Sequence, residues 1–152
     1  MTMKLIREEI EKVEVLTEEK NGKKSLYIKG PFLQAEVVNR NGRMYPMGIM
    51  EREVKRYAED YVKKGRALGE LGHPDGPTVN LDRVSHKITE LYRSGNNFVG
   101  KAQILSTPMG KIAESLLKDG VTLGVSSRGI GSLKENDKGY KEVGEDLSLI
   151  HI

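Results

Sequence analysis

The stretch VSHKITELYRSGNNFVGKAQIL, residues 84–105, decides the fold of this chain. Its first part, residues 84–93, partly alternates apolar and polar side chains, which is typical of a half-buried strand. Ser94-Gly95-Asn96-Asn97 then supplies turn residues, and residues 98–105 follow as a second strand. The stretch therefore predicts an antiparallel β-hairpin.

A helix is predicted on each side of this hairpin. In residues 47–64, apolar side chains recur at helical spacing and form a single stripe that faces a core, made by Met50, Val54, Tyr57, Ala58 and Tyr61. After the hairpin, Thr107 can cap a helix, and Pro108 can occupy its first turn, where the missing N–H costs little. Gly120 ends that second helix.

The remaining segments predict short strands and turns. The strands are expected over residues 25–29, stopped by Gly30-Pro31, and over residues 32–39, 67–71 and 123–127, with a last hairpin over residues 133–143. Residues 1–24 are interpreted as a helix, an edge strand and a polar loop ending at Asn21-Gly22. The predicted class is α+β, with mostly antiparallel strands and helices packed outside them.

Composition excludes several classes of protein. A chain of 152 residues fits one domain that can bury a core, and the lack of cysteine excludes disulfides, a thiolate nucleophile and Cys-ligated zinc. No apolar run approaches the length of a membrane span, and the first nine residues are too charged for a signal peptide, so we expect a soluble intracellular protein. The net charge of +3 comes from 25 basic and 22 acidic residues that are well mixed, so nucleic acid is not an expected partner.

His73 is the first candidate for chemistry, in the block Gly69-Glu70-Leu71-Gly72-His73-Pro74. The density of Gly and Pro places it on a loop just past a strand end. Pro74 restricts the backbone of His73 while the ring stays free, which suits a general base with a pKa near neutral. A surface histidine without a role is the alternative.

Ser126 and Ser127 are the candidate nucleophiles, in Gly124-Val125-Ser126-Ser127-Arg128-Gly129. Without cysteine, Ser, Thr, Lys or a metal-bound water must serve as nucleophile. Adjacent strand residues point to opposite faces, so we expect only one serine to face His73. Arg128 and the backbone donors of a turn at Gly129 can stabilise an oxyanion. The alternatives are a polar strand end before a turn and an ordinary exposed arginine.

His86 has two interpretations. It shares a predicted strand face with Val84 and Ile88, so it is either a partly buried histidine with a satisfied hydrogen bond or a third member that orients His73. A metal-dependent hydrolase is a further alternative. Its ligands would be His73, Asp75, Asp82 and His86, although their spacing matches no standard ligand pattern.

Several blocks, in order, resemble one family. Residues 32–46 (FLQAEVVNRNGRMYP), 69–74 (GELGHP), 124–132 (GVSSRGIGS) and 140–145 resemble successive motifs of the prohead core proteases of T-even-like tailed phages. The order and spacing agree over about residues 26–146.

The resemblance implies a fold like that of the herpesvirus assembly protease, a small, mostly antiparallel β-barrel with helices around it. It implies a His–Ser endopeptidase without a cofactor, with His73 as base, Ser126 as nucleophile and Ser127 as the second choice. The expected substrates are scaffold and major capsid proteins, and the protease itself, cut after a Glu two positions beyond an apolar residue. We expect a homo-oligomer that works inside the assembling prohead in the host cytoplasm. A non-enzymatic capsid or scaffold binding module is the alternative.

The two ends of the chain depart from the family pattern. Residues 1–24 match no family motif. Residues 147–152, LSLIHI, match the in-frame translation of a transposon adapter used in sequencing libraries. We therefore expect a C-terminally truncated protease domain over residues 1–146 and a non-native tail over residues 147–152, which makes His151 non-native. On this view the tail makes few core contacts, a sheet edge stays open, and the third catalytic residue lies in the missing segment.

Overall fold

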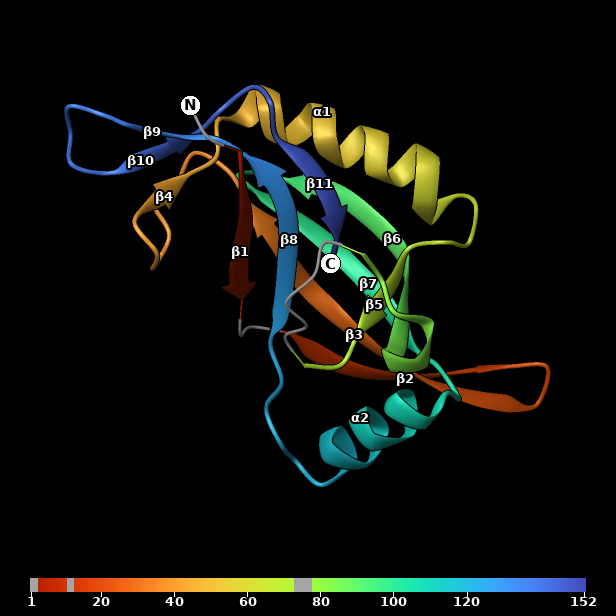
Figure 1. Cartoon of the computed structure of the whole chain (residues 1–152). Helices are drawn as coiled ribbons and strands as arrows, with labels where there is room; N and C mark the ends of the chain where they lie inside the picture. Colours follow the sequence, from red (N-terminus) through yellow and green to blue (C-terminus); the bar gives the residue numbers. More distant parts are fainter. Residues whose placement is uncertain (1–2, 11–12, 73–77) are drawn as a thin grey trace.

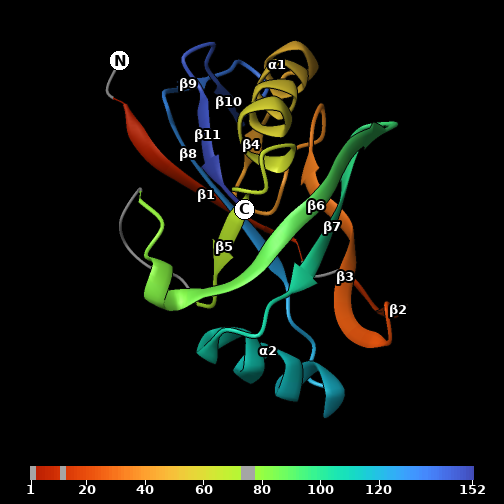
Figure 2. The same ribbon diagram turned by 90° about the vertical axis from the view of Figure 1, so that its right-hand side faces the viewer.

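The computed structural model describes residues 3–10, 13–72 and 78–152. Within these ranges, eleven strands form three sheets, and two α-helices lie at opposite ends of the molecule (Figures 1 and 2). The strand orders are β2-β3-β7-β6-β5, β1-β8-β11 and β4-β10-β9. The α+β class is confirmed. The expected closed barrel is not found among the described strands, which divide into three separate sheets instead.

The five-stranded sheet contains the predicted hairpin. Its strands are β2 (Glu14–Lys20), β3 (Lys23–Gln34), β5 (Leu68–Glu70), β6 (Val84–Ser94) and β7 (Asn97–Ile104). β6 and β7 pair antiparallel from His86↔Ile104 to Ser94↔Asn97, around a turn in which Gly95 has φ of 64°. Alternating buried residues on β7 face the core, as the sequence pattern predicts.

β3 is longer than predicted. The stop expected at Gly30-Pro31 is wrong, because β3 continues to Gln34 and pairs with β7 from Tyr27↔Gln103 to Gln34↔Asn97. Pro31 lies beside a register irregularity, where the lack of its N–H is tolerated. The Phe32 ring covers Gly100, where an added Cβ would lie 2.0 Å from the ring. The glycine therefore makes room for a core aromatic side chain.

The N-terminal residues form strands rather than the expected helix. β1 (Lys4–Ile10) pairs antiparallel with β8 (Val125–Gly131), from Lys4↔Gly131 to Ile10↔Val125, and buries Ile6. The turn expected at Asn21-Gly22 is confirmed and joins β2 to β3. A strand whose partner lies about 120 residues away leaves little local trace in the sequence.

The segment 147–152 packs into the core, so the expectation of few core contacts is wrong. β11 (Ser148–His151) pairs with the second edge of β8, and Leu147 and Leu149 are each 4% exposed. β8 is therefore paired on both of its edges. The apolar residues of this segment fall at positions that face the core, which is enough to bury an extended chain.

Side chains of α1 (Met47–Tyr57) bind the main chain of the same segment. The Leu149 N–H donates to Glu53 Oε1 at 2.9 Å, and Arg56 donates to the Leu149 carbonyl at 2.6 Å. Arg52 donates to the Leu147 carbonyl at 2.9 Å. Such contacts require an extended backbone and no particular side chain.

Both predicted helices are present. α1 buries Met50, Val54 and Tyr57 and continues into a π-helical turn, Ala58–Val62, close to the predicted end. α2 (Pro108–Lys118) begins as predicted, because Thr107 Oγ1 accepts the Gly110 N–H at 3.0 Å. No helix in the described ranges combines the length and the apolar character that crossing a membrane requires.

The smallest sheet confirms the last predicted hairpin. β9 (Leu133–Glu135) and β10 (Lys141–Val143) pair antiparallel, with Gly139 in the turn at φ of 90°. β4 (Arg43–Met44) adds to β10 in parallel, which the sequence did not indicate. A short 3₁₀ helix, Leu81–Arg83, precedes β6.

Candidate active site

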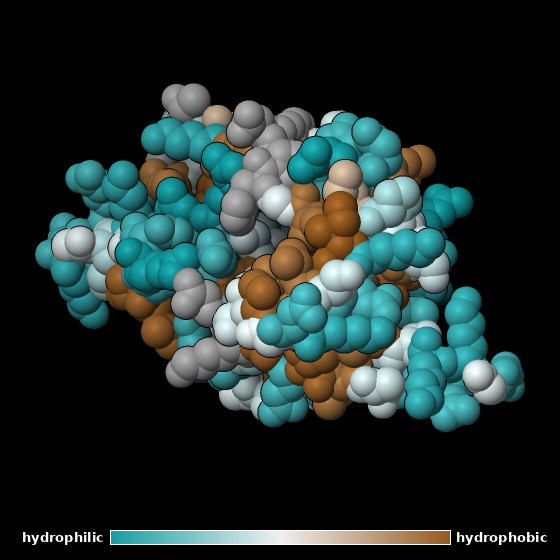
Figure 3. Space-filling model, turned by 90° about the horizontal axis from the view of Figure 1, so that it is seen from below, coloured by the Kyte–Doolittle hydropathy of each residue, from teal (hydrophilic) through white to brown (hydrophobic). Residues whose placement is uncertain are grey.

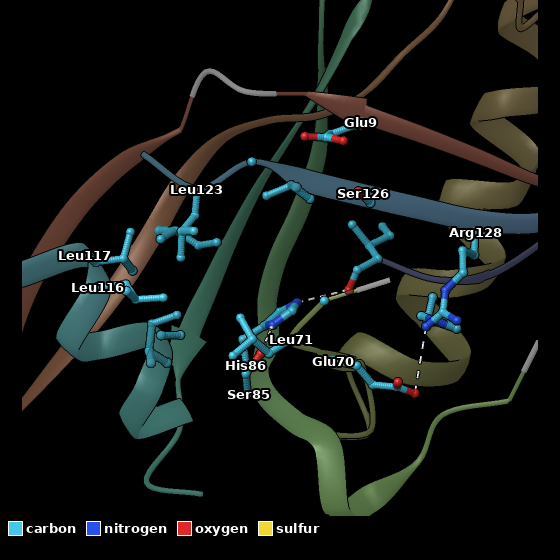
Figure 4. A pocket seen from close by; sticks show the side chains of 18 of the residues that line it. Glu9, Glu70, Leu71, Ser85, His86, Leu116, Leu117, Leu123, Ser126 and Arg128 are labelled. Carbon is cyan, nitrogen blue, oxygen red and sulfur yellow. Dashed lines mark hydrogen bonds and ion pairs between the residues drawn. The ribbon is translucent and has the colours of Figure 1, made fainter. Parts of the chain in front are cut away.

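A cavity of about 410 Å³ lies among β8, β6, the end of β5 and α2. One part of its wall is apolar and includes Leu116, Leu117 and Leu123. The other part is polar, with side chains from several strands (Figure 4): Arg7, Glu9, Glu70, Ser85, His86, Ser126, Arg128 and His151. The apolar character extends to the surface near α2, where Leu81, Ile112 and Val121 are exposed, and brown areas interrupt the polar surface at that end (Figure 3).

The two serines of β8 lie on opposite faces of the sheet. Ser126 is half-buried and lines the cavity with His86 and Arg128. Ser127 is buried and lines a separate pocket of about 520 Å³ with Phe32 and Tyr45. This is the alternation that the strand interpretation predicts. The idea of a strand end directly after Ser127 is wrong, because β8 continues to Gly131.

His73 lies outside the described residues, as do the other members of 73–77. The two residues before it, Leu71 and Gly72, line the cavity. Leu71 is fixed to Arg83 twice, since its N–H donates to the Arg83 carbonyl at 3.2 Å and Arg83 Nη2 donates to its carbonyl at 3.2 Å. Gly72 has φ of 92°, which favours glycine. Leu71 and Gly72 are therefore fixed at the cavity wall.

His86 has both ring nitrogens within hydrogen-bond distance of an oxygen. Nδ1 lies 2.9 Å from Ser85 Oγ, and Nε2 lies 3.1 Å from the Ile152 carbonyl oxygen. A carbonyl only accepts, so Nε2 donates and Nδ1 accepts from the Ser85 hydroxyl. Burial lowers the pKa of His86, although the bond to Ile152 opposes this shift. His86 is therefore partly buried with both ring nitrogens hydrogen-bonded, as the first of its two interpretations expects.

The His151 side chain lies in the same cavity and makes no hydrogen bond to the residues that the structure describes. It is buried, and neither ring nitrogen has a partner among the residues that the structure describes. Burial, and then the charge of Arg128 and the proximity of His86, lower the pKa of His151 to about 4. An unsatisfied buried polar group costs about 1–3 kcal/mol.

Arg128 is buried rather than exposed, so its interpretation as an ordinary surface arginine is wrong. Its side chain is 6% exposed and lies on the same face of β8 as Ser126, two residues away. Its guanidinium Nη2 is 3.8 Å from Glu70 Oε1. Burial lowers the pKa of Arg128, Glu70 opposes this, and Arg7 adds to it.

The turn predicted at Gly129 and Gly131 is also wrong. Both glycines belong to β8, and Gly129 pairs with Ile6 on one side and with Leu149 on the other. Backbone N–H groups of a strand between two partners point along the sheet toward those partners, and not into the cavity. The glycines allow close packing instead, because a Cβ at Gly129 would lie 3.0 Å from the Ser148 carbonyl oxygen.

The sequence interpretation missed the acidic and basic side chains that complete the polar wall. Glu70 has a side chain that is only 1% exposed, and its Oε1 accepts the Asn80 N–H at 2.7 Å. The signal available was a charged residue in the mostly apolar segment 67–71, directly before the His73 loop. Arg7 and Glu9 come from β1, and Glu9 pairs with Ser126. Both residues line the cavity because β1 pairs with β8, and the sequence did not predict β1.

The metal alternative gains no support from the described residues. No group of three or more His, Asp or Glu side chains that could hold a metal occurs in the part of the chain that the structure describes. Asp82 is exposed beside β6, and the predicted ligands His73 and Asp75 lie outside the described residues.

Comparison with known proteins gives a consistent result. The family model described as "Prohead core protein serine protease" matches residues 6–151. The prohead core protein protease of Enterobacteria phage T4 is 42% identical over 130 residues, which are 84% of this chain and 61% of that protein. The solved structure of the bacteriophage T4 capsid assembly protease, gp21, matches with a TM-score of 0.92 at 36% identity, over 98% of this chain and 94% of that one. The chain therefore spans about 61% of the length of its curated T4 relative, and it belongs to the prohead core protein serine protease family.

Proposed function

We propose that this protein is a serine endopeptidase that cleaves scaffold and capsid proteins, and itself, during phage prohead maturation. Ser126 acts as the nucleophile and His73 as the general base. One observation carries the assignment. Ser126 faces a cavity whose wall includes Leu71 and Gly72, the residues directly before His73, whereas Ser127 faces a different pocket.

The proposed chemistry follows acyl transfer to serine. His73 takes the proton of the Ser126 hydroxyl as Oγ attacks the peptide carbonyl, and returns it to the leaving amine as the peptide bond breaks. Water then attacks the acyl-enzyme. His73 takes a proton from this water and gives it to Ser126 Oγ as the ester bond breaks and the acid product leaves. The Arg128 guanidinium stabilises the oxyanion, since its side chain shares the Ser126 face of β8. We assign no oxyanion-stabilising role to the Gly129 N–H, because β8 is paired on both sides at this residue.

The two halves of the cavity wall support the proposed specificity. Leu116, Leu117 and Leu123 offer an apolar surface, and Arg7 and Arg128 offer positive charge. A segment with a Glu at the cleaved bond and an apolar residue two positions before it has complementary groups for both. Cleavage after such a Glu is therefore the proposed reaction.

His86 is proposed to orient His73 in the extended protein. It lines the same cavity as Ser126, and the acceptor of its Nε2–H in this chain is the Ile152 carbonyl. We also propose that residues 147–152 are a foreign tail, because His151 is buried there without a partner among the described residues. The native segment after Asp146 would then supply the groups that surround His86, including the third catalytic residue.

The proposed setting follows from the family. The protein would act as a homo-oligomer inside the assembling prohead, in the host cytoplasm. A relation to the herpesvirus assembly protease is proposed for the fold, supported by its mostly antiparallel sheets and outer helices.

Serine substitutions test the proposed function. In a chain extended past Asp146 with its downstream codons, Ser126→Ala should abolish cleavage of scaffold protein, and Ser127→Ala should retain measurable cleavage. An active Ser126→Ala beside an inactive Ser127→Ala would show that the nucleophile is the other serine. Full activity in both variants would exclude a serine mechanism at this strand.

A further inference from the structure

Glu70 is a buried carboxylate that the proposed chemistry does not yet use. It is the last residue of β5, and its side chain is 1% exposed. It lines the cavity together with Ser126 and Arg128. A buried carboxylate is costly unless it is paired, so its partners indicate what it does.

Two groups approach the same oxygen of Glu70. Oε1 accepts the Asn80 N–H at 2.7 Å, and it lies 3.8 Å from Arg128 Nη2. The first contact is a hydrogen bond. The second is an ion pair beyond hydrogen-bond distance, so it acts through charge. Oε2 has no hydrogen-bond partner within the described ranges.

The Arg128 guanidinium has a like charge nearby. Burial lowers the pKa of Arg128, Glu70 opposes this shift, and Arg7, which lines the same cavity, adds to it. Figure 4 shows the Arg128 side chain extending from β8 toward Glu70, with Ser126 on the same strand. A carboxylate on this side therefore attracts the guanidinium into the cavity, against the repulsion of the second arginine.

We propose that Glu70 is a positioning residue, whose negative charge holds the Arg128 guanidinium in the cavity that Ser126 faces. The inference rests on the proposed function, because Arg128 matters to turnover only if Ser126 performs the chemistry. Glu70 does not touch the substrate, and it acts through Arg128 alone.

A purely structural role for Glu70 makes a different prediction. Its hydrogen bond to Asn80 N–H could simply close the base of the segment 71–80. Glu70→Gln separates the two roles, because the amide retains an oxygen that accepts the Asn80 N–H but loses the charge that attracts Arg128. Glu51→Gln is the matched control, since Glu51 is an exposed glutamate that pairs with Arg93 on the surface.

The experiment measures kcat and KM for a scaffold-derived peptide, with the rate of Ser126 labelling by a fluorophosphonate, in the extended chain. Losing one oxyanion donor typically costs ~100- to 1000-fold in turnover. We therefore expect Arg128→Met to lower kcat to that degree, Glu70→Gln to lower it ~10-fold or more with KM little changed, and Glu51→Gln to leave it unchanged. The double variant should be no slower than Arg128→Met alone.

Each outcome decides the question. Two results for Glu70→Gln overturn the proposal. One is a wild-type kcat. The other is a fold-loss of kcat in the Arg128→Met background that equals the fold-loss in the wild-type background, because Glu70 would then act independently of Arg128. If Glu70→Gln does not fold, Glu70→Asp is measured, since it keeps the charge but withdraws it by one methylene. A folded Glu70→Asp should keep most of kcat because the charge remains, and a loss of kcat as large as that of Arg128→Met overturns the proposal. If the wild type neither cleaves nor labels, the proposed function fails and the Glu70 role fails with it.

Discussion

The substitution Gly69→Ala tests the packing of β5 against the cavity. Gly69 pairs with His86, and a Cβ added there would lie 2.0 Å from His86 Nε2, 2.3 Å from Cε1 and 2.5 Å from the Ile152 carbonyl oxygen. These distances are far below van der Waals contact, so the imidazole ring must leave its position. It then loses its contacts with Ser85 Oγ and the Ile152 carbonyl.

The cost can be worked from these contacts. Overpacking a core typically costs ~1–3 kcal/mol, and each hydrogen bond lost costs ~0.5–1.5 kcal/mol. We expect Gly69→Ala to lower the free energy of unfolding by ~2–6 kcal/mol, a large share of the ~5–15 kcal/mol of a typical domain. Urea unfolding followed by circular dichroism measures the change.

Gly48→Ala is the matched control for this experiment. Gly48 lies in α1, and an added Cβ there meets nothing within 4 Å. Alanine favours a helix over glycine by up to ~1 kcal/mol, so this variant should be as stable as the wild type or more so. If Gly69→Ala unfolds at the wild-type urea concentration, the close approach of His86 to β5 is incorrect.

Two further predictions concern the core and the tail. Gly100→Ala should lower the free energy of unfolding by ~1–3 kcal/mol, because the new Cβ would meet the Phe32 ring at 2.0 Å; an unchanged urea midpoint would contradict the packing of Phe32 over β7. The free energy of unfolding should fall as the pH drops from about 6.5 to about 4. The reason is that His151 in the unfolded chain takes up a proton at its ordinary pKa of ~6.5, whereas in the folded chain its pKa is about 4. At ~1.4 kcal/mol per pKa unit, the loss of stability reaches ~3 kcal/mol. His151→Leu should remove that part of the pH dependence in urea titrations at pH 7 and pH 4.5, and an identical slope in both proteins would contradict the burial of the ring.

The sequence predicts elements whose signals are local. The hairpin of residues 84–105 and the helix capped by Thr107 are found as expected, because alternation, turn residues and capping groups all lie within the segment. The stop at Gly30-Pro31 failed because a bulge in the pairing with β7 tolerates Pro31. The pairing of β8 with β1 was missed because these strands are distant in the chain, and its pairing with β11 was missed because residues 147–152 were expected to make few core contacts.

The candidate site likewise has features that local sequence patterns predict and features that they do not. The opposite orientation of Ser126 and Ser127 follows from strand alternation alone, and the structure confirms it. The burial of Arg128 and its pairing with Glu70 depend on β5 lying beside β8 in space, which no local pattern indicates. The expected turn at Gly129 failed for a related reason, because glycine there allows the approach of β11.

The central claim is that Ser126 is the nucleophile, and covalent labelling tests it most directly. The extended chain is treated with a fluorophosphonate, digested and mapped by mass spectrometry, with Ser126→Ala and Ser127→Ala treated in parallel. We expect one adduct per chain on Ser126, retained in Ser127→Ala and absent from Ser126→Ala, since Ser126 lines the cavity whose wall includes Leu71 and Gly72, whereas Ser127 lines a different pocket. An adduct on Ser127 would contradict the assignment, and an absence of labelling in a folded protein that still cleaves scaffold would contradict the serine mechanism itself.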